Sequence, residues 1–224
     1  MAIELKTYIV AFIDLLGFSA MVKHDCESAN GDQKYIESLY SIYLKTKQLK
    51  ESIDGLQLIQ FSDSVVLAIP YTPDNYMKIL NVISHYQYDL LQSGILCRGG
   101  VSYGKHFSTE DFLFSNGLID AYRLESTVAS TPRVVVSRDL VALVNPAKSP
   151  NEYLEFERDG LCFVKYLNGA SHADNWRAIS NAIPEELSEF PSIRSKQIWL
   201  IDYYNHKFPD NIHKNILRFQ QDVA

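Results

Sequence analysis

Two aspartates that lie within apolar runs are the residues of this chain best suited to chemistry. Asp14 ends the run Tyr8–Ile13, and Asp63 separates two short apolar runs, with a serine on either side. An ionised carboxylate inside a strand is costly unless a positive charge compensates it. If the two strands lie side by side, both carboxylates can hold divalent cations against a nucleotide triphosphate. The simpler alternative is that each aspartate only starts a turn, which the serines beside Asp63 would suit.

Hydrophobic patterning predicts the elements that must position these aspartates. Residues 7–14 are apolar on both faces, which predicts a strand in the centre of a sheet. Gly17 permits a tight turn after this strand. Residues 56–70 are predicted to form two short strands folded about Ser62–Asp63–Ser64, with Pro70 at the end of the second.

Two helices are predicted to pack beside these strands. Thr72 would cap the later helix, with Pro73 in its first turn, and Gly94 would close it. Its predicted buried face consists of Tyr76, Ile79, Leu80, Ile83 and Leu90. The earlier helix is predicted to bury one apolar stripe with helical spacing. That stripe consists of Ile36, Leu39, Tyr40, Tyr43 and Leu44.

The remainder of residues 1–170 also alternates strands with helices. Strands are predicted at 95–105, 132–137 and 161–167, and a short helix at 117–125. Gly100 would let the first of these strands pass close to its neighbour. This order predicts an α+β fold, a ferredoxin-like sheet with helices packed on it.

Residues 171–224 are predicted to form a helical C-terminal extension of the domain in residues 1–170. Apolar residues favour one helix around Ile193–Tyr204 and a second at Ile212–Phe219. The extension is expected to pack either on the domain or on a second subunit.

Composition excludes several classes of protein. The 224 residues are 46% hydrophobic, which suits one domain with an appendage, and no run approaches the ~20 apolar residues of a membrane span. A net charge of −6 argues against a nucleic-acid surface. Cys26, Cys97 and Cys162 are scattered, which predicts reduced cytosolic thiols and no zinc site. The N-terminus has no pattern of a secretion signal, so a cytoplasmic location is expected.

Five motifs of this chain resemble, in order, those of the catalytic domain of class III nucleotidyl cyclases. Phe12–Ser19 is similar to the first metal-binding motif of that family, and Phe61–Asp63 to the second, usually Gly-Asp at a hairpin. Arg98–Gly104 resembles a strand whose arginine contacts the triphosphate. Ala121–Glu125 resembles the helix whose arginine stabilises the transition state, and Pro132–Ser137 the strand after it. The resemblance covers about residues 7–167 and implies the fold of that domain.

The resemblance also implies roles for individual residues. Asp14 and Asp63 would hold two Mg²⁺ or Mn²⁺ ions, helped by the main-chain carbonyl of Leu15. Arg98 would bind the β- or γ-phosphate. Arg123 would stabilise the negative charge that develops at the α-phosphate. The main-chain N–H groups that would cradle phosphate oxygens are those of Gly17, Phe18 and Ser19.

Cyclases of this family share each active site between two subunits. One subunit contributes the metals and Arg98, and the other contributes Arg123 and much of the base pocket. A chain that carries both sets implies a homodimer with two equivalent sites. Lys165 lies near the region where such cyclases carry a phosphate-binding lysine, although a solvated strand lysine is an equal alternative.

Three positions depart from the purine cyclases. Ile119 stands where the family has a ribose-orienting asparagine, and the polar pair that reads a purine falls on Ile59 and Phe112. Neither of the latter side chains can form hydrogen bonds, so the preferred base should differ. A small cyclase without purine determinants resembles the pyrimidine cyclases of bacterial Pycsar anti-phage systems. That resemblance implies UTP as the favoured substrate and cyclic UMP as a messenger for a separate effector.

Four alternatives stay open. The substrate could be CTP, or the chain could be a purine cyclase that reads its base through other residues. A third alternative is a nucleotidyltransferase of the diguanylate cyclase or polymerase palm type, although no Gly-Gly-Asp-Glu-Phe run is present. The fourth is a nucleotide-binding module that is catalytically inactive because Ile119 replaces the asparagine of the family.

Overall fold

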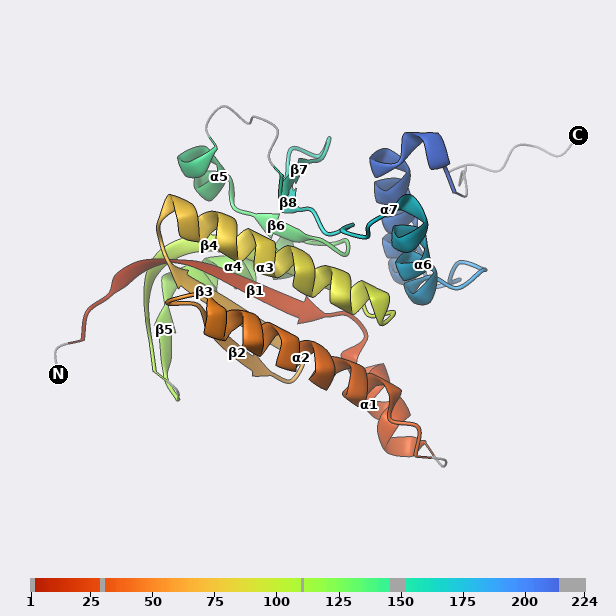
Figure 1. Cartoon of the computed structure of the whole chain (residues 1–224), viewed down its shortest axis with the longest axis horizontal. Coiled ribbons are helices and arrows are strands. Elements are labelled where there is room, and N and C mark those ends of the chain that lie inside the picture. The colour runs from red at the N-terminus through yellow and green to blue at the C-terminus, as the bar shows by residue number, and fades with distance from the viewer. Residues whose placement is uncertain (1–2, 29–30, 110, 146–151, 214–224) are drawn as a thin grey trace, which may run out of the picture.

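A computed structural model describes the chain except residues 1–2, 29–30, 110, 146–151 and 214–224 (Figure 1). The strands are β1 (Lys6–Leu15), β2 (Gln57–Phe61), β3 (Ser64–Pro70), β4 (Cys97–Ser108), β5 (Leu113–Ser115), β6 (Val134–Val136), β7 (Leu154–Phe156) and β8 (Cys162–Val164). The helices are α1 (Phe18–Glu27), α2 (Lys34–Ser52), α3 (Pro73–Gln92), α4 (Asn116–Thr127), α5 (Arg138–Val144), α6 (His172–Ala182), α7 (Pro191–Lys207) and the short 3-10 helix η1 (Pro209–Asn211).

The strands form one mixed sheet in the order β2-β3-β1-β4-β6-β8-β7, and β5 pairs with β4 outside this path. β4 and β6 run parallel, whereas the other neighbours are antiparallel. Helices pack on the sheet, so the predicted α+β class is confirmed.

β1 is central because its apolar residues fill a core on each face of the sheet. Ile9 and Ile13 lie in the core shared with α3, and α2 and α3 cross this face in Figure 1. Val10 and Phe12 point to the opposite face, where they pack with Ala121 of α4. The alternation along β1 therefore directs even-numbered residues, Asp14 among them, toward the face that carries α4.

Glycines of β4 allow α4 to lie directly on the strand. A Cβ atom at Gly100 would lie 2.3 Å from the carbonyl oxygen of Ala121, which is too close for any side chain. A Cβ atom at Gly104 would lie 2.5 Å from Oδ1 of Asn116. The close neighbour of Gly100 is thus the helix α4 and not a strand, which the sequence pattern did not indicate.

α3 forms as predicted. The Thr72 hydroxyl accepts a hydrogen bond from the Asn75 N–H at 3.0 Å, Pro73 begins the helix, and Gly94 follows it in the left-handed conformation with φ of 75°. All five apolar residues assigned to its inner face are buried.

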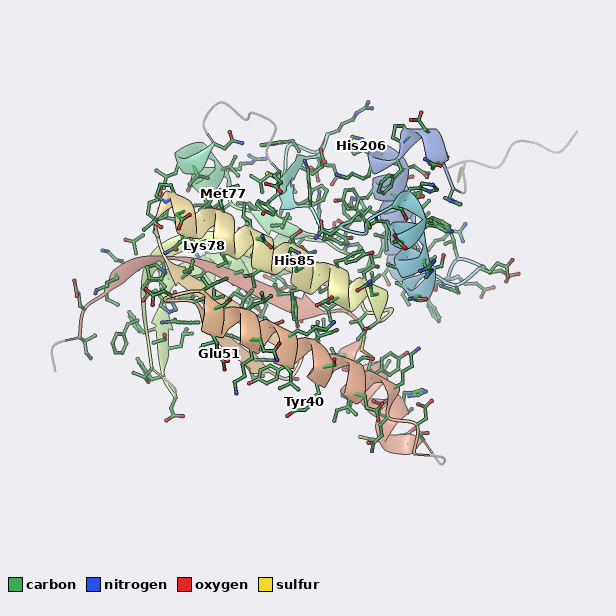
Figure 2. The ribbon with its side chains drawn as sticks, viewed as in Figure 1. Tyr40, Glu51, Met77, Lys78, His85 and His206 are labelled. Atoms are coloured by element: carbon green, nitrogen blue, oxygen red, sulfur yellow. The ribbon has the colours of Figure 1, made fainter. Side chains whose placement is uncertain are left out.

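The predicted buried stripe of the earlier helix is only partly correct, because Leu39 and Tyr43 are half-buried while the other three residues are not. This segment forms two helices, α1 and α2, and the residues that α2 buries are Ile42 and Thr46. Ile36, Tyr40 and Leu44 are exposed, and Figure 2 shows Tyr40 on the outer side of α2. The reason is that α2 packs mainly against α3, and this contact buries the side of α2 that carries Ile42 and Thr46.

The C-terminal extension packs on its own chain. α6 and α7 form a second apolar core together with Tyr88 and Leu91 of α3 and Phe163 of β8. The helix predicted around residues 193–204 corresponds to α7. Most of the second predicted helix, Ile212–Phe219, lies outside the described residues. No helix within the described ranges is long and apolar enough to cross a membrane.

Candidate active site

The end of β1 and the β2–β3 turn bring the two aspartates together. Asp14 is opposite Ser64 in the β1–β3 register, and Asp63 immediately precedes that serine. The Leu15 N–H donates a hydrogen bond to the Asp63 carbonyl oxygen at 2.9 Å, which ties the turn to the strand end. Burial raises the pKa of Asp14, Arg98 opposes this rise, and the negative charge of Asp63 adds to it. A divalent cation would relieve this repulsion between neighbouring carboxylates.

The donor set here suits Mg²⁺ or Mn²⁺. In the part of the chain that the structure describes, no group of three or more His, Cys, Asp or Glu residues could hold a metal ion. Cations between Asp14 and Asp63 would therefore need main-chain, water or phosphate oxygens as further ligands, which Mg²⁺ normally takes. Leu15, whose carbonyl is the predicted main-chain ligand, is the last residue of β1.

An open turn suited to phosphate follows β1. Gly17 has φ of 79°, which the left-handed region permits for glycine, and α1 begins at Phe18 without a side-chain cap. Among the described residues, no protein acceptor takes a hydrogen bond from the N–H groups of Gly17, Phe18 or Ser19. A Cβ atom built on Gly17 would meet nothing within 4 Å, so the space around this turn is open. These three donors can therefore bind an anion at the positive end of α1.

Arg98, on β4, is the cationic residue beside Asp14 and Asp63. It lies directly opposite Asp14 in the β1–β4 register, with Nε 3.5 Å from Asp14 Oδ2. Its Nη2 lies 2.7 Å from Oε1 of Glu125, an ion pair that lacks hydrogen-bond geometry. The structure thus brings Asp14, Asp63 and Arg98 together at the end of β1 that leads into the Gly17 turn.

Glu125 is a member of this cluster to which the sequence assigned no role. Only 3% of it is exposed, and it reaches Arg98 from α4. Burial raises the pKa of Glu125, Arg98 lowers it, and the charges of Asp14 and Asp63 raise it further. The available signal was a carboxylate at a helix position that faces the sheet, which requires a cationic partner.

Arg123 is not part of this cluster. It precedes Glu125 by two residues on α4, a rotation of about 200° around the helix axis, so the two side chains leave opposite sides. The Arg123 side chain is 70% exposed, and its ion-pair partner is Asp120 on the same helix at 3.3 Å. Arg123 lines a cavity of about 810 Å³, here named the α4 cavity, bounded by α4, β4, β6 and the start of α5.

The predicted base-reading positions lie on the α4 side of the sheet and near its rim. Ile59 of β2 is half-buried against the apolar core that contains Phe12. Phe112 precedes β5 and is 56% exposed, and its ring centroid lies 6.4 Å from that of Phe107. Ile119 projects from α4 and is 51% exposed. None of these three residues offers a side-chain hydrogen bond.

Two further residues differ from the sequence interpretation. Lys165 does not line the α4 cavity, because it lies beside Glu155 with Nζ 3.8 Å from Oε2. Asn116, to which the sequence analysis assigned no role, lines that cavity together with Arg123.

No protein-family model and no curated protein matches this sequence. Solved structures of nucleotidyl cyclase domains do match the fold. The adenylyl cyclase CyaB from P. aeruginosa is 13% identical with a TM-score of 0.51, over 78% of this chain and 99% of that one. The guanylate cyclase domain of RhGC from Catenaria anguillulae in complex with GTP is 16% identical with a TM-score of 0.50, over 74% of this chain and 99% of that one. The fold is therefore that of the class III nucleotidyl cyclase catalytic domain.

Proposed function

We propose that this protein is a nucleotidyl cyclase that converts UTP to 3′,5′-cyclic UMP and pyrophosphate. The observation that carries the proposal is the convergence of Asp14, Asp63 and Arg98 beside the open Gly17 turn, within a cyclase fold. In the reaction the ribose 3′-oxygen forms a bond to the α-phosphorus. The bond between the α-phosphorus and the oxygen that bridges it to the β-phosphorus breaks, so pyrophosphate leaves, and the 3′-hydroxyl proton passes to solvent.

The residues of this chain would bind and orient the nucleotide. Asp14, Asp63 and the Leu15 carbonyl would hold the cations, and the N–H groups of Gly17–Ser19 would bind phosphate oxygens. Arg98, held between Asp14 and Glu125, would bind the β- or γ-phosphate. When bound, the two cations would lower the pKa of the 3′-hydroxyl and screen the leaving charge.

The direction of Arg123 supports the proposal of a shared site in a homodimer. Glu125 faces Arg98 within the chain, so Arg123 faces away and would serve the metals of a second subunit. Exposed apolar side chains supply a surface that suits such an interface. They include Phe61, Phe112, Phe114, Ile119 and Tyr122.

The proposed preference for a pyrimidine rests on Ile59, Phe112 and Ile119, which lack the polar groups of purine cyclases. UTP is favoured, and CTP is the alternative. As the Pycsar resemblance implies, the cyclic nucleotide would act in the cytoplasm as a messenger for a separate anti-phage effector.

Product identity tests this function. The purified chain is incubated with Mn²⁺ and each of the four ribonucleoside triphosphates, with Asp63→Ala as the control, and products are identified by mass spectrometry. Cyclic UMP that disappears in the control is the expected result. Cyclic CMP would show that the substrate is CTP and not UTP. Cyclic AMP or cyclic GMP would overturn the argument from Ile59 and Phe112. Absence of any product would favour a nucleotide-binding module.

Complementation tests the shared site. Asp14→Ala and Arg123→Ala chains carry different tags, are co-expressed, and are purified as heterodimers by two affinity steps. Each homodimer should be inactive, whereas the heterodimer should regain one working site. Inactive heterodimers of correct mass would contradict the shared site.

A further inference from the structure

The α4 cavity contains a second arginine to which no role has been assigned. Arg138, the first residue of α5, lines the cavity together with the α4 residues Asp120 and Arg123. The cavity volume of about 810 Å³ is within the range that accommodates a nucleotide-sized ligand. Building on the proposed function, we infer that Arg138 binds the triphosphate whose metal ions are held by the other subunit.

Arg138 is available for an anionic ligand. It is exposed, and no carboxylate of the described residues lies within ion-pair distance of its guanidinium. Asp159 acts on it only through the longer-range attraction that helps to lower the Asp159 pKa. A planar guanidinium without a protein partner can bind two phosphate oxygens at once.

The charges that line the cavity favour an anion. Lys105, Arg123 and Arg138 are cationic, and Asp120 and Asp139 are acidic. The ion pair between Arg123 and Asp120 is solvent-exposed, so it offers little resistance to an incoming phosphate.

The metal-bearing half of the site needs such a cation from the partner. Arg98 already faces two carboxylates, those of Asp14 and Glu125, so its charge is largely compensated before a triphosphate binds. Lys165, for which phosphate binding was one of two alternatives, lies beside Glu155 and outside the cavity. Because Arg138 lines the same cavity as Arg123, it can supply this second phosphate contact.

The test uses two heterodimers that carry the same three substitutions in different arrangements. The first pairs Asp14→Ala/Arg138→Ala with Arg123→Ala, so the single working site lacks Arg138. The second pairs Asp14→Ala with Arg123→Ala/Arg138→Ala, so the working site keeps Arg138. The KM for the nucleotide that the wild-type chain uses should be about tenfold higher in the first heterodimer. The second should match the reference heterodimer of Asp14→Ala with Arg123→Ala.

Equal KM values in the two arrangements, or a higher KM in the second, would overturn the inference. Arg138→Gln in place of Arg138→Ala keeps most of the side-chain volume and should give the same difference. The two heterodimers should have the same melting temperature. If Arg138 had a purely structural role in one subunit, a change in KM would be accompanied by a change in melting temperature. An inactive reference heterodimer would instead refute the shared site itself, and the inference with it.

Discussion

The carboxylate of Glu125 lies 2.7 Å from the guanidinium of Arg98, beneath the helix that carries Arg123 on its outer side. One short helix therefore carries charged residues on two different sides. Its inner side holds Arg98 of its own chain through Glu125, and its outer side carries Arg123, which under the proposed function would serve a second chain. This division explains why a single chain holds every predicted catalytic residue but does not bring all of them together.

Glu125→Ala should reduce kcat/KM by about ten- to a hundredfold, because Arg98 loses the partner that positions it. Stability should fall on the order of 2 kcal/mol, since truncating one member of a buried ion pair leaves the other uncompensated. Kinetics and urea denaturation measure the two effects. Glu51→Ala, at an exposed position of α2, is the matched control and should change neither (Figure 2). An active Glu125→Ala enzyme with unchanged KM would show that Arg98 needs no such support.

Gly100→Ala should displace α4 from the sheet. The new Cβ atom would lie 2.3 Å from the Ala121 carbonyl oxygen and 2.6 Å from Leu124 Cβ. The nearest of these atoms belongs to the main chain of α4, so the helix itself would have to move. We expect a loss of about 1–3 kcal/mol in urea denaturation, together with lower activity. Ser126→Ala, on the exposed side of α4, controls for substitution near this helix. Unaltered stability of Gly100→Ala would contradict the close packing.

Phe112→Ser should raise the KM for the nucleotide several-fold while leaving stability within about 0.5 kcal/mol, because the side chain is 56% exposed. The physical reason is the loss of an apolar surface against the base. Phe190→Ser removes another exposed aromatic side chain, at the N-cap of α7, and should leave the KM unchanged. If both substitutions alter the KM alike, Phe112 has no specific role at the base.

His106 should make the fold less stable in mild acid. Its ring is buried, stacks on Tyr8 at 4.6 Å, and donates from Nε2 to Oε1 of Gln57 at 2.9 Å. Burial lowers its pKa below the ordinary value of 6.5. The unfolded chain therefore binds a proton at a higher pH than the folded chain does, and stability declines as pH falls below 6.5.

The measurement is the urea midpoint at pH 7.5 and pH 5.5. His106→Gln should remove part of the decline between these two values, because glutamine keeps a hydrogen-bonding side chain that does not titrate. His85→Gln, at an exposed position of α3, should leave the decline intact (Figure 2). An identical pH dependence in wild type and His106→Gln would contradict the assignment.

Local patterns in the sequence determined much of the fold and one half of the site. The two-sided apolar run of residues 7–14 can only be a central strand, and Thr72, Pro73 and Gly94 delimit α3 by local chemistry. The sequence also placed Asp14 at the end of one apolar strand and Asp63 in the turn between two others, although their proximity depends on the long-range pairing of β1 with β3. The strand, the ends of the helix and the turn depend on residues close together in the chain.

Tertiary packing alone decided the rest. The face that α2 buries depends on its contact with α3, and the most apolar row was not the one chosen. The ion pair of Glu125 with Arg98 depends on how α4 is seated over Gly100, and Arg123 faces away as a consequence. Long-range contacts also place Lys165 beside Glu155 and Arg138 at the α4 cavity, which local patterns did not indicate. A sequence specifies which side chains exist and in what local element, whereas the rotation of each element against its neighbours decides which of them meet.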